Sequence, residues 1–243
     1  MAGMKFTYEG ETAVVTGASG GIGAATAALL IERGANVVLA ARSADKLADL
    51  AARLGPRALP LQLDVADPDS VARCFAEAER RFGRIGILVN NAGFGRFETV
   101  AETDDETIAA QMNVNYLGLV RCTKRVLPGM LERRSGAIVN IASIAGKMAT
   151  AKSAAYAATK HAVLGFTNAL RQELHGTGVR VVAVNPGPVA TGFFDVADPG
   201  GQYASRVRRF MVTPERVARA ALDGLARGKA EVNVPSWLGA AAG

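Results

Sequence analysis

The sequence is short of the features that mark several special classes of protein. Its two cysteines, Cys74 and Cys122, lie in separate predicted helical segments without a Cys-x-x-Cys spacing, so we expect reduced core residues in a reducing compartment. No apolar run reaches about 18 residues, and the opening stretch MAGMKFTYEGET lacks the apolar core of a signal peptide. We therefore expect a cytoplasmic protein with no membrane span.

Aromatic residues are scarce as well, at 6% of the chain, and no basic stripe is interleaved with them. The net charge of +6 arises from 28 Lys and Arg that are spread along the sequence, with only short clusters such as Arg206 to Arg209. A scattered surplus of this kind is typical of a solvated surface rather than of a nucleic-acid footprint. We therefore predict no nucleic-acid partner, and we predict no metal site.

Internal repeats, low-complexity tracts and linkers are absent too, and 49% apolar residues can fill one large core. We therefore predict a single domain over residues 1–243. Short apolar runs, most of them without polar alternation, alternate with helical stretches, which indicates strands buried on both faces. The runs are 12–16, 36–41, 58–63, 85–90, 136–142, 179–185 and 231–235. Their order predicts a Rossmann-type α/β fold, a doubly wound, mainly parallel seven-stranded sheet with helices on both faces.

Capping signals mark three helix starts, and one long stretch has no regular pattern. Two starts show an N-cap residue followed by proline, and the third has the spacing of a capping box. They are Asp67-Pro68, Thr213-Pro214, and Thr103 with Glu106. The irregular stretch, 186–212, is rich in Pro and Gly. Because a loop of that length in a compact domain is usually functional, we predict a substrate-binding loop there.

A glycine-rich stretch follows the first predicted strand directly. In TGASGGIG, residues 16–23, Gly17, Gly21 and Gly23 would let the backbone turn sharply, approach a pyrophosphate closely and pack the next helix against the sheet. The amide groups and the positive end of that helix dipole favour phosphate. An ordinary Gly-rich turn is the alternative, but the strand before and the helix after are the context that a dinucleotide-binding loop requires.

The end of the second predicted strand indicates which dinucleotide binds. Ala40-Ala41-Arg42-Ser43 contains no carboxylate that would accept hydrogen bonds from a free ribose 2′-OH. The guanidinium of Arg42 is instead planar and permanently charged, and it can form bidentate hydrogen bonds with a 2′-phosphate. An exposed arginine that opens the next helix is the alternative. We predict NADP(H) rather than NAD(H).

Several motifs in a fixed order carry a resemblance to one family. They are TGASGGIG at 16, LDV at 63, NNAG at 90, MNVNYLG at 112, Ser143, YAATK at 156 and NPGPVAT at 185. In this combination the chain, from residue 11 to roughly 235, resembles the short-chain dehydrogenase/reductase family in its compact single-domain form. The resemblance implies an NADP(H)-dependent oxidoreductase that interconverts a carbonyl and a secondary alcohol, with Tyr156 and Lys160 in catalysis.

The chemistry of these residue types agrees with that role. Reduction of a ketone needs a proton donor at the oxygen, and a lysine one helical turn away would favour the phenolate of Tyr156 and lower its pKa. Residues four apart share a helix face, so Lys160 can also reach the nicotinamide ribose. Ser143 follows a strand, where its hydroxyl would hold the substrate carbonyl near Tyr156, although a serine there is more often a cap or turn residue.

Further roles follow from the resemblance alone. It implies that Asn115 interrupts its long predicted helix and holds a water in a proton relay with the lysine; a polar residue on a wet helix face is the alternative. It also implies an adenine contact at Asp64 and a cofactor groove along several loops. The implied cofactor contacts are Gly17, Ser19, Gly21, Ile22, Gly23, Arg42, Asp64, Val65, Asn91, Ala92, Gly93, Tyr156, Lys160, Pro186, Gly187, Val189 and Thr191.

The substrate pocket is expected to draw on aromatic residues near these motifs, which favours an apolar or aromatic substrate. They are Phe94, Phe193, Phe194, Tyr203 and Phe210. Two other functions stay open. One is a 3-oxoacyl carrier-protein reductase, for which Arg134 fits one expected basic position but Thr177 occupies the other. The second is a catalytically silent NADP-sensing binding protein, against which the intact catalytic residues argue.

Two long predicted helices, at about 103–132 and 155–175, point to self-association. The second carries small residues away from its catalytic face, at Ala157, Ala158, Ala162 and Gly165. Packing such an apolar outer face against the same face of a second copy, related by a two-fold axis, removes both faces from water. Because members of the family commonly pair through these helices, and again through the last strand, we predict at least a homodimer and further expect a homotetramer.

Overall fold

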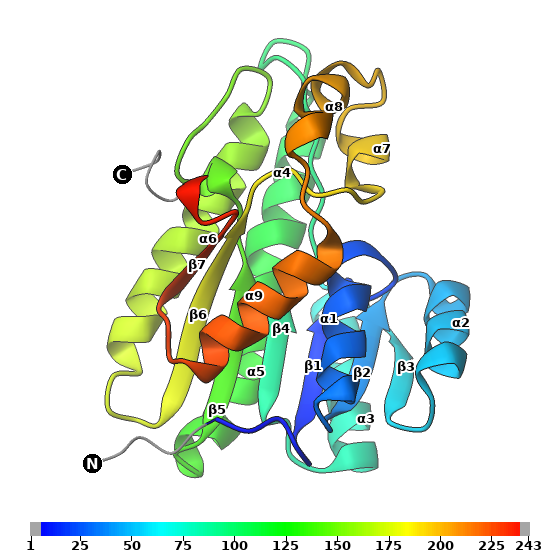
Figure 1. Ribbon diagram of the computed structural model, residues 1–243, viewed down its shortest axis with the longest axis vertical. Coiled ribbons are helices and arrows are strands. Elements are labelled where there is room, and N and C mark those ends of the chain that lie inside the picture. The colour runs from blue at the N-terminus through cyan, green and yellow to red at the C-terminus, as the bar shows by residue number, and fades with distance from the viewer. Residues whose placement is uncertain (1–5, 239–243) are drawn as a thin grey trace.

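The computed structural model describes residues 6–238, so the parts of our predictions that concern residues 1–5 and 239–243 lie outside the described residues. A parallel seven-stranded sheet forms the centre of the molecule, in the order β3-β2-β1-β4-β5-β6-β7 (Figure 1). The strands are β1 (Thr12–Thr16), β2 (Asn36–Ala41), β3 (Ala58–Gln62), β4 (Ile87–Asn90), β5 (Gly136–Ile141), β6 (Val179–Pro186) and β7 (Glu231–Val234). The predicted fold class is confirmed.

Helices cover both faces of this sheet (Figure 1). The α-helices are α1 (Gly21–Glu32), α2 (Ala44–Leu54), α3 (Pro68–Phe82), α4 (Asp105–Met112), α5 (Leu119–Glu132), α6 (Ala154–Glu173), α7 (Phe193–Ala197), α8 (Gln202–Val207) and α9 (Pro214–Ala226). A π-helix, η1 (Asn113–Gly118), joins α4 to α5, and η2 (Ile144–Gly146) and η3 (Arg208–Phe210) are short 3₁₀ turns. Within residues 6–238, no helix is both long and apolar enough to cross a membrane.

The core has two halves, one on each face of the sheet, because successive strand residues point to opposite faces. In β1, Ala13 and Val15 join the cluster packed under α1, α2 and α9. Val14 joins the cluster packed under α3, α5 and α6. All five residues of β1 are buried, which explains why the strands read as continuous apolar runs. Cys74 and Cys122 are free and buried in the second cluster, as expected for core residues.

The strand order places a crevice at one end of the sheet. β1 pairs with β2 on one side and with β4 on the other, so the chain winds outward in both directions from this point. Helices leave the two strands toward opposite faces, and ligands of such sheets bind outside the carboxyl ends of the strands at this reversal. The motifs predicted to bind the cofactor follow β1, β2 and β4 directly.

Two predicted helix starts are confirmed and the third is wrong. The side chain of Asp67 accepts a hydrogen bond from Asp69 N at 2.9 Å and that of Thr213 from Arg216 N at 3.3 Å, each before a proline. The expected capping box at Thr103 does not form. Asp104 caps α4 through Thr107 N instead, while the Thr103 hydroxyl donates to a backbone oxygen of the preceding turn. A carboxylate caps the start of a helix at least as well as a hydroxyl does. Asp104 therefore takes the N-cap position, and α4 begins one residue later than predicted.

The stretch 186–212 is also more regular than predicted. It contains the short helices α7 and α8 and the turn η3, and Val189 pairs with Val212 across its base. The carboxylate of Asp198 accepts hydrogen bonds from Tyr203 N and Ala204 N, both at 2.8 Å, and so orders the start of α8. Helices of five and six residues, such as α7 and α8, are too short to leave a periodic signal in the sequence.

Candidate active site

A cleft of about 630 Å³ lies at the carboxyl ends of the strands and gathers almost every predicted site residue. The glycine-rich loop, Arg42, the segment after β4, Ser143, Tyr156, Lys160 and the segment after β6 all line it. Two predicted residues, Gly23 and Asn115, do not line the cleft. Motifs spread over the whole sequence therefore form one continuous site.

The glycine-rich loop has the conformation that its glycines permit. Gly17 and Gly21 have φ of 66° and 53°, which other residues rarely adopt. A Cβ on Gly23 would lie 2.4 Å from the carbonyl oxygen of Gly17. Gly23 is thus required for packing α1 against the loop, and it does not line the cleft, so its contact with the cofactor stays a prediction.

Asn91 holds the glycine-rich loop to the end of β4. Its side-chain amide donates to the carbonyl oxygens of Thr16 and Gly17, at 3.0 and 3.1 Å. The Thr16 hydroxyl accepts from the backbone N–H groups of Asn91 and Ala92, both at 3.0 Å. These hydrogen bonds fix the glycine-rich loop to the segment after β4, at the base of the crevice between β1 and β4. The Asn91 side chain therefore shapes the groove, a role that its motif alone did not reveal.

The N-terminus of α1 suits an anionic group. In the described part of the chain, no side chain caps this end, and the first turn of α1 contains no acidic residue. The amide groups and positive dipole end of the helix therefore face the cleft without competition from a carboxylate. This donor set fits the pyrophosphate of a dinucleotide.

Two cations lie at the far end of the cleft. Arg42 follows β2, and Lys46 lies in the first turn of α2; both are exposed and line the cleft. Sequence reasoning identified Arg42 and missed Lys46, although the spacing of four residues was available as a signal. Together the two side chains provide a basic end that matches a terminal phosphate.

At the opposite end, α6 presents Tyr156 and Lys160 on one face. Both are buried, with exposed fractions of 9% and 5%. The Lys160 ammonium donates to Ile141 O at 2.9 Å and lies 5.8 Å from the centre of the Tyr156 ring. Ser143 follows β5, where its hydroxyl hydrogen-bonds Tyr156 and also accepts from Ala145 N at 3.0 Å. The predicted partners thus meet, and Ser143 also serves as the cap of η2.

The pKa values of the two titratable groups move in directions set by burial. Burial raises the pKa of Tyr156 to about 12, an effect that the hydrogen bond from Ser143 partly offsets and Tyr203 reinforces. Burial lowers the pKa of Lys160 to about 8. Our prediction of a lowered pKa for Tyr156 is wrong here, because burial disfavours the phenolate more than its polar neighbours favour it. At neutral pH the phenol therefore carries its proton.

Asn115 lies in η1, beneath the cleft, where it ties three segments together. Its side-chain amide donates to Phe94 O at 2.8 Å and to the Thr159 hydroxyl at 3.0 Å, and its side-chain oxygen accepts from Phe94 N at 2.9 Å. The residue is 2% exposed, so the alternative of a wet helix face is wrong. The interruption of the long helix at Asn115 agrees with the resemblance to the family.

An aromatic wall covers Tyr156. Phe94, Phe193, Phe194 and Tyr203 line the cleft as predicted, and Phe97, which the sequence analysis missed, stands among them. The ring of Phe193 lies 5.5 Å from that of Tyr156. Phe210 was predicted in this wall but lies outside the cleft with 51% of its surface exposed. Its position in η3, past the end of α8, turns it away, and this cannot be read from apolarity alone.

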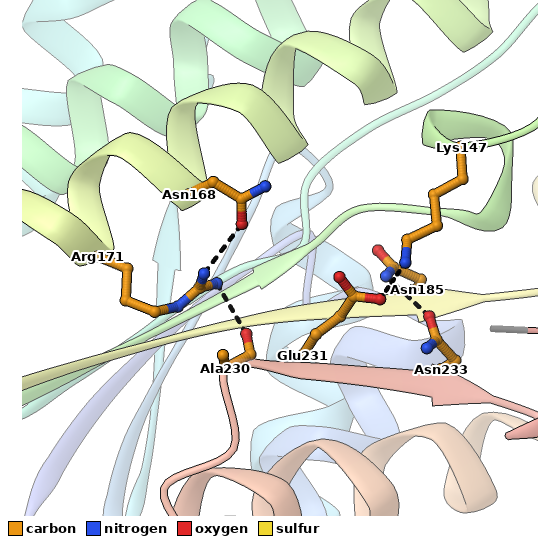
Figure 2. A network of polar contacts seen from close by, with 7 residues as sticks. All are labelled: Lys147, Asn168, Arg171, Asn185, Ala230, Glu231 and Asn233. Carbon is orange, nitrogen blue, oxygen red and sulfur yellow. Dashed lines mark hydrogen bonds and ion pairs between the residues drawn. The ribbon is translucent and has the colours of Figure 1, made fainter. Parts of the chain in front are cut away.

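A polar network joins the edge of the sheet to α6 and to the turn that follows Ser143 (Figure 2). Lys147, in the turn after Ser143, forms an ion pair with Glu231 of β7. The Asn185 amide donates to Asn233 across β6 and β7 at 2.9 Å. Arg171 of α6 holds the same edge: it donates to the side chain of Asn168 at 2.9 Å and to the backbone oxygen of Ala230 at 2.8 Å (Figure 2). The edge strand, the Ser143 turn and α6 are thus joined.

Comparisons with known proteins agree with this geometry. The profile of the family described as short chain dehydrogenase matches residues 11–199. The chain is 40% identical over 183 residues to the 3-oxoacyl-[acyl-carrier-protein] reductase of Vibrio harveyi, which covers 75% of each chain. A crystal structure of a variant actinorhodin polyketide ketoreductase with NADPH has a TM-score of 0.87 and 35% identity, over 97% of this chain and 99% of that one. A Burkholderia phymatum short chain dehydrogenase/reductase in complex with NAD has a TM-score of 0.90 and 26% identity, over 98% and 93%.

Proposed function

The chain belongs to the short chain dehydrogenase family and is an oxidoreductase, and from this premise we propose that it is an NADP(H)-dependent reductase that interconverts an apolar or aromatic carbonyl compound and its secondary alcohol. The observation that carries the proposal is that one cleft is lined by the glycine-rich loop, by the basic residues Arg42 and Lys46, and by the Ser143, Tyr156 and Lys160 side chains. A bound nicotinamide would supply or accept the hydride.

The protein's own residues provide the proton and the position of the substrate. Because its pKa is about 12, Tyr156 is protonated at neutral pH and is the donor to the substrate oxygen during reduction. Ser143 donates a hydrogen bond to the same oxygen and orients it. A charged Lys160 favours the phenolate that remains after proton transfer. The apolar rings around Tyr156 exclude water and strengthen these interactions.

Oxidation of NADPH in the presence of a panel of ketones tests this function directly. We expect turnover with aryl or long-chain ketones and less with small polar ones, because the wall of the cleft is aromatic. Tight NADPH binding without turnover of any ketone would instead support a silent NADP-sensing protein. Ser143, Tyr156 and Lys160 line the cleft together, which favours the enzyme.

The preference for NADP(H) rests on Arg42 and Lys46. We expect Arg42→Ala to weaken NADPH binding roughly ten- to a hundredfold, the range for a lost hydrogen-bonded ion pair, and to leave NADH binding nearly unchanged. Titration of cofactor fluorescence measures both affinities. Arg53→Ala removes an exposed arginine from the other end of α2, outside the cleft, and is the matched control. An equal loss of both cofactors would show that Arg42 does not recognise the 2′-phosphate.

A 3-oxoacyl carrier-protein reductase is the second candidate, favoured by the similarity to the Vibrio reductase. Arg134 is exposed just after α5, and its guanidinium donates to Gly176 O at 2.8 Å. A docking role for Arg134 therefore requires it to leave this backbone contact. Comparing turnover of a 3-oxoacyl carrier protein with that of the same acyl group as a free thioester decides whether the carrier is recognised.

We propose that the outer face of α6 is a contact between two copies of the chain. Ala158 and Gly165 are exposed there and Ala162 is partly exposed, whereas Ala157, predicted on the same face, is 2% exposed and belongs to the core. A Cβ on Gly165 would meet no described atom within 4 Å. The outer face thus permits close approach of a second helix.

Gly165→Arg is therefore expected to convert the oligomer to a monomer at micromolar concentration, as measured by light scattering. Arginine favours a helix more than glycine does, by about 1 kcal/mol, so the helix itself should not be weakened. Ala44→Arg places the same charge at an exposed position of α2 and should leave the mass unchanged. A wild-type mass near 25.2 kDa, the mass of one chain, would contradict the proposed contact.

A further inference from the structure

The segment from Gly93 to Phe97, which we call the strap, lines the cleft and is anchored on both sides. The side chain of Asn115 forms hydrogen bonds with both the backbone N–H and the carbonyl oxygen of Phe94. Arg96 N donates to the buried Gln111 side chain of α4 at 3.2 Å. These contacts fix the strap to the helical layer that also packs against α6.

The other side of the strap is tied to α7. Phe97 N donates to Ala197 O at 2.7 Å, and the Arg96 guanidinium donates to Val196 O at 3.2 Å. Both acceptors are backbone oxygens at the end of α7, so these two contacts do not depend on which side chains α7 carries. The α7–α8 segment, residues 193–207, therefore takes its position over the cleft partly from the strap.

Phe97 is the residue at which these two sets of contacts meet. The centre of its ring lies 5.8 Å from that of Tyr156 and 5.0 Å from that of Tyr203, in edge-to-face geometry. Phe193 and Phe194 of α7 each lie 6.2 Å away. One side chain thus touches the ring of Tyr156 and the aromatic residues of both α7 and α8.

The backbone of the strap packs closely on its neighbours beside this ring. A Cβ on Gly95 would lie 2.9 Å from the Phe193 ring and 3.0 Å from the Tyr156 ring, so the backbone already packs directly on both. Edge-to-face aromatic pairs are directional, so we expect a substitution at Phe97 to disturb its contacts with both rings.

We propose that Phe97 is a positioning residue for carbonyl reduction: it couples the closed position of the α7–α8 segment to the orientation of the Tyr156 ring. This inference rests on the function proposed above. Phe97 would act through Tyr156 and through exclusion of water, not by donating or accepting a proton. Small errors in the placement of an acid have large effects on rate, so we expect the coupling to be visible in kcat.

The first test replaces Phe97 by leucine and measures reduction of a small aliphatic ketone, which needs little of the aromatic wall. We expect kcat to fall about tenfold or more because a misplaced acid slows proton transfer. NADPH affinity is expected to stay within about twofold, since affinity for a cofactor bound beneath the wall depends on other contacts. Phe97→Tyr keeps the ring and its edge contacts and should restore most of kcat.

Trypsin reports on the segment itself, because Arg206, Arg208 and Arg209 are exposed within or next to α8. Loss of the ring contacts should speed cleavage at these arginines about tenfold, in line with a larger open population. Phe82→Leu makes the same substitution at a partly buried phenylalanine that ends α3, outside the cleft, and should change neither kcat nor the cleavage rate.

A double-variant cycle with Phe194→Leu separates coupling from general destabilisation. Phe194 contacts Phe97, whereas its ring has no contact with that of Tyr156 among the described aromatic pairs. If Phe97 transmits the position of α7, Phe194→Leu lowers kcat, and adding it to Phe97→Leu causes little further loss. Losses in kcat that multiply independently, or a Phe97→Leu enzyme with wild-type kcat, would overturn the inference. If the wild type reduces no ketone, the proposed function has failed instead.

Discussion

Tyr156→Phe is expected to remove nearly all ketone reduction, at least about a hundredfold in kcat, because a positioned general acid contributes that much or more. The substitution deletes only the hydroxyl that hydrogen-bonds Ser143. The ring contacts with Phe97 and Phe193 should persist, so the α7–α8 segment should keep its position. NADPH affinity, measured by fluorescence titration, should therefore stay within about twofold of the wild type.

Tyr116→Phe is the matched control for this result. Tyr116 lies in η1 with its ring packed on Phe166, and it does not line the cleft. Loss of its hydroxyl should leave kcat almost unchanged. A Tyr156→Phe enzyme whose turnover remains within tenfold of the wild type would exclude Tyr156 as the acid.

Lys160→Ala is expected to damage both turnover and cofactor binding. Without the ammonium, the phenolate that forms as Tyr156 gives up its proton loses its nearest favourable charge, which should lower kcat about a hundredfold. Loss of a charged hydrogen bond to the nicotinamide ribose should weaken NADPH roughly tenfold. Lys124→Ala, an exposed lysine of α5, should change neither value. Unchanged NADPH affinity in Lys160→Ala would remove the ribose contact from its role.

The pH dependence of the reductive kcat/KM provides an independent readout of Lys160. Burial lowers its pKa to about 8, so Lys160 is charged below that pH and neutral above it. Tyr156 stays protonated through the same range because its pKa is about 12. The reductive kcat/KM of the wild type should therefore decline as the pH rises through about 8. In Lys160→Ala this decline should disappear, and a decline that persists would assign it to another group.

Sequence alone determined the sheet and the outline of the site. A strand buried on both faces must be apolar at successive positions, so the runs around Val14 and Val38 identified parallel strands without knowledge of their neighbours. The spacing of Tyr156 and Lys160 fixed their common face, because residues four apart on a helix always lie on the same side. Gly17 and Gly21 predicted a turn that only glycine adopts readily, and the structure shows it.

Tertiary structure decided the features that depend on contacts between distant segments. Gly23 faces Gly17 O beneath the loop rather than the cleft, and Asn115 holds the strap, although both lie in recognisable motifs. Phe97 entered the aromatic wall in place of Phe210 because backbone hydrogen bonds to α7 set its position. The raised pKa of Tyr156 also depends on tertiary packing, because the lysine near Tyr156 is visible in the sequence, whereas the depth of burial that raises the pKa is not. Local periodicity fixes which residues share a face, but packing of remote elements fixes what that face meets.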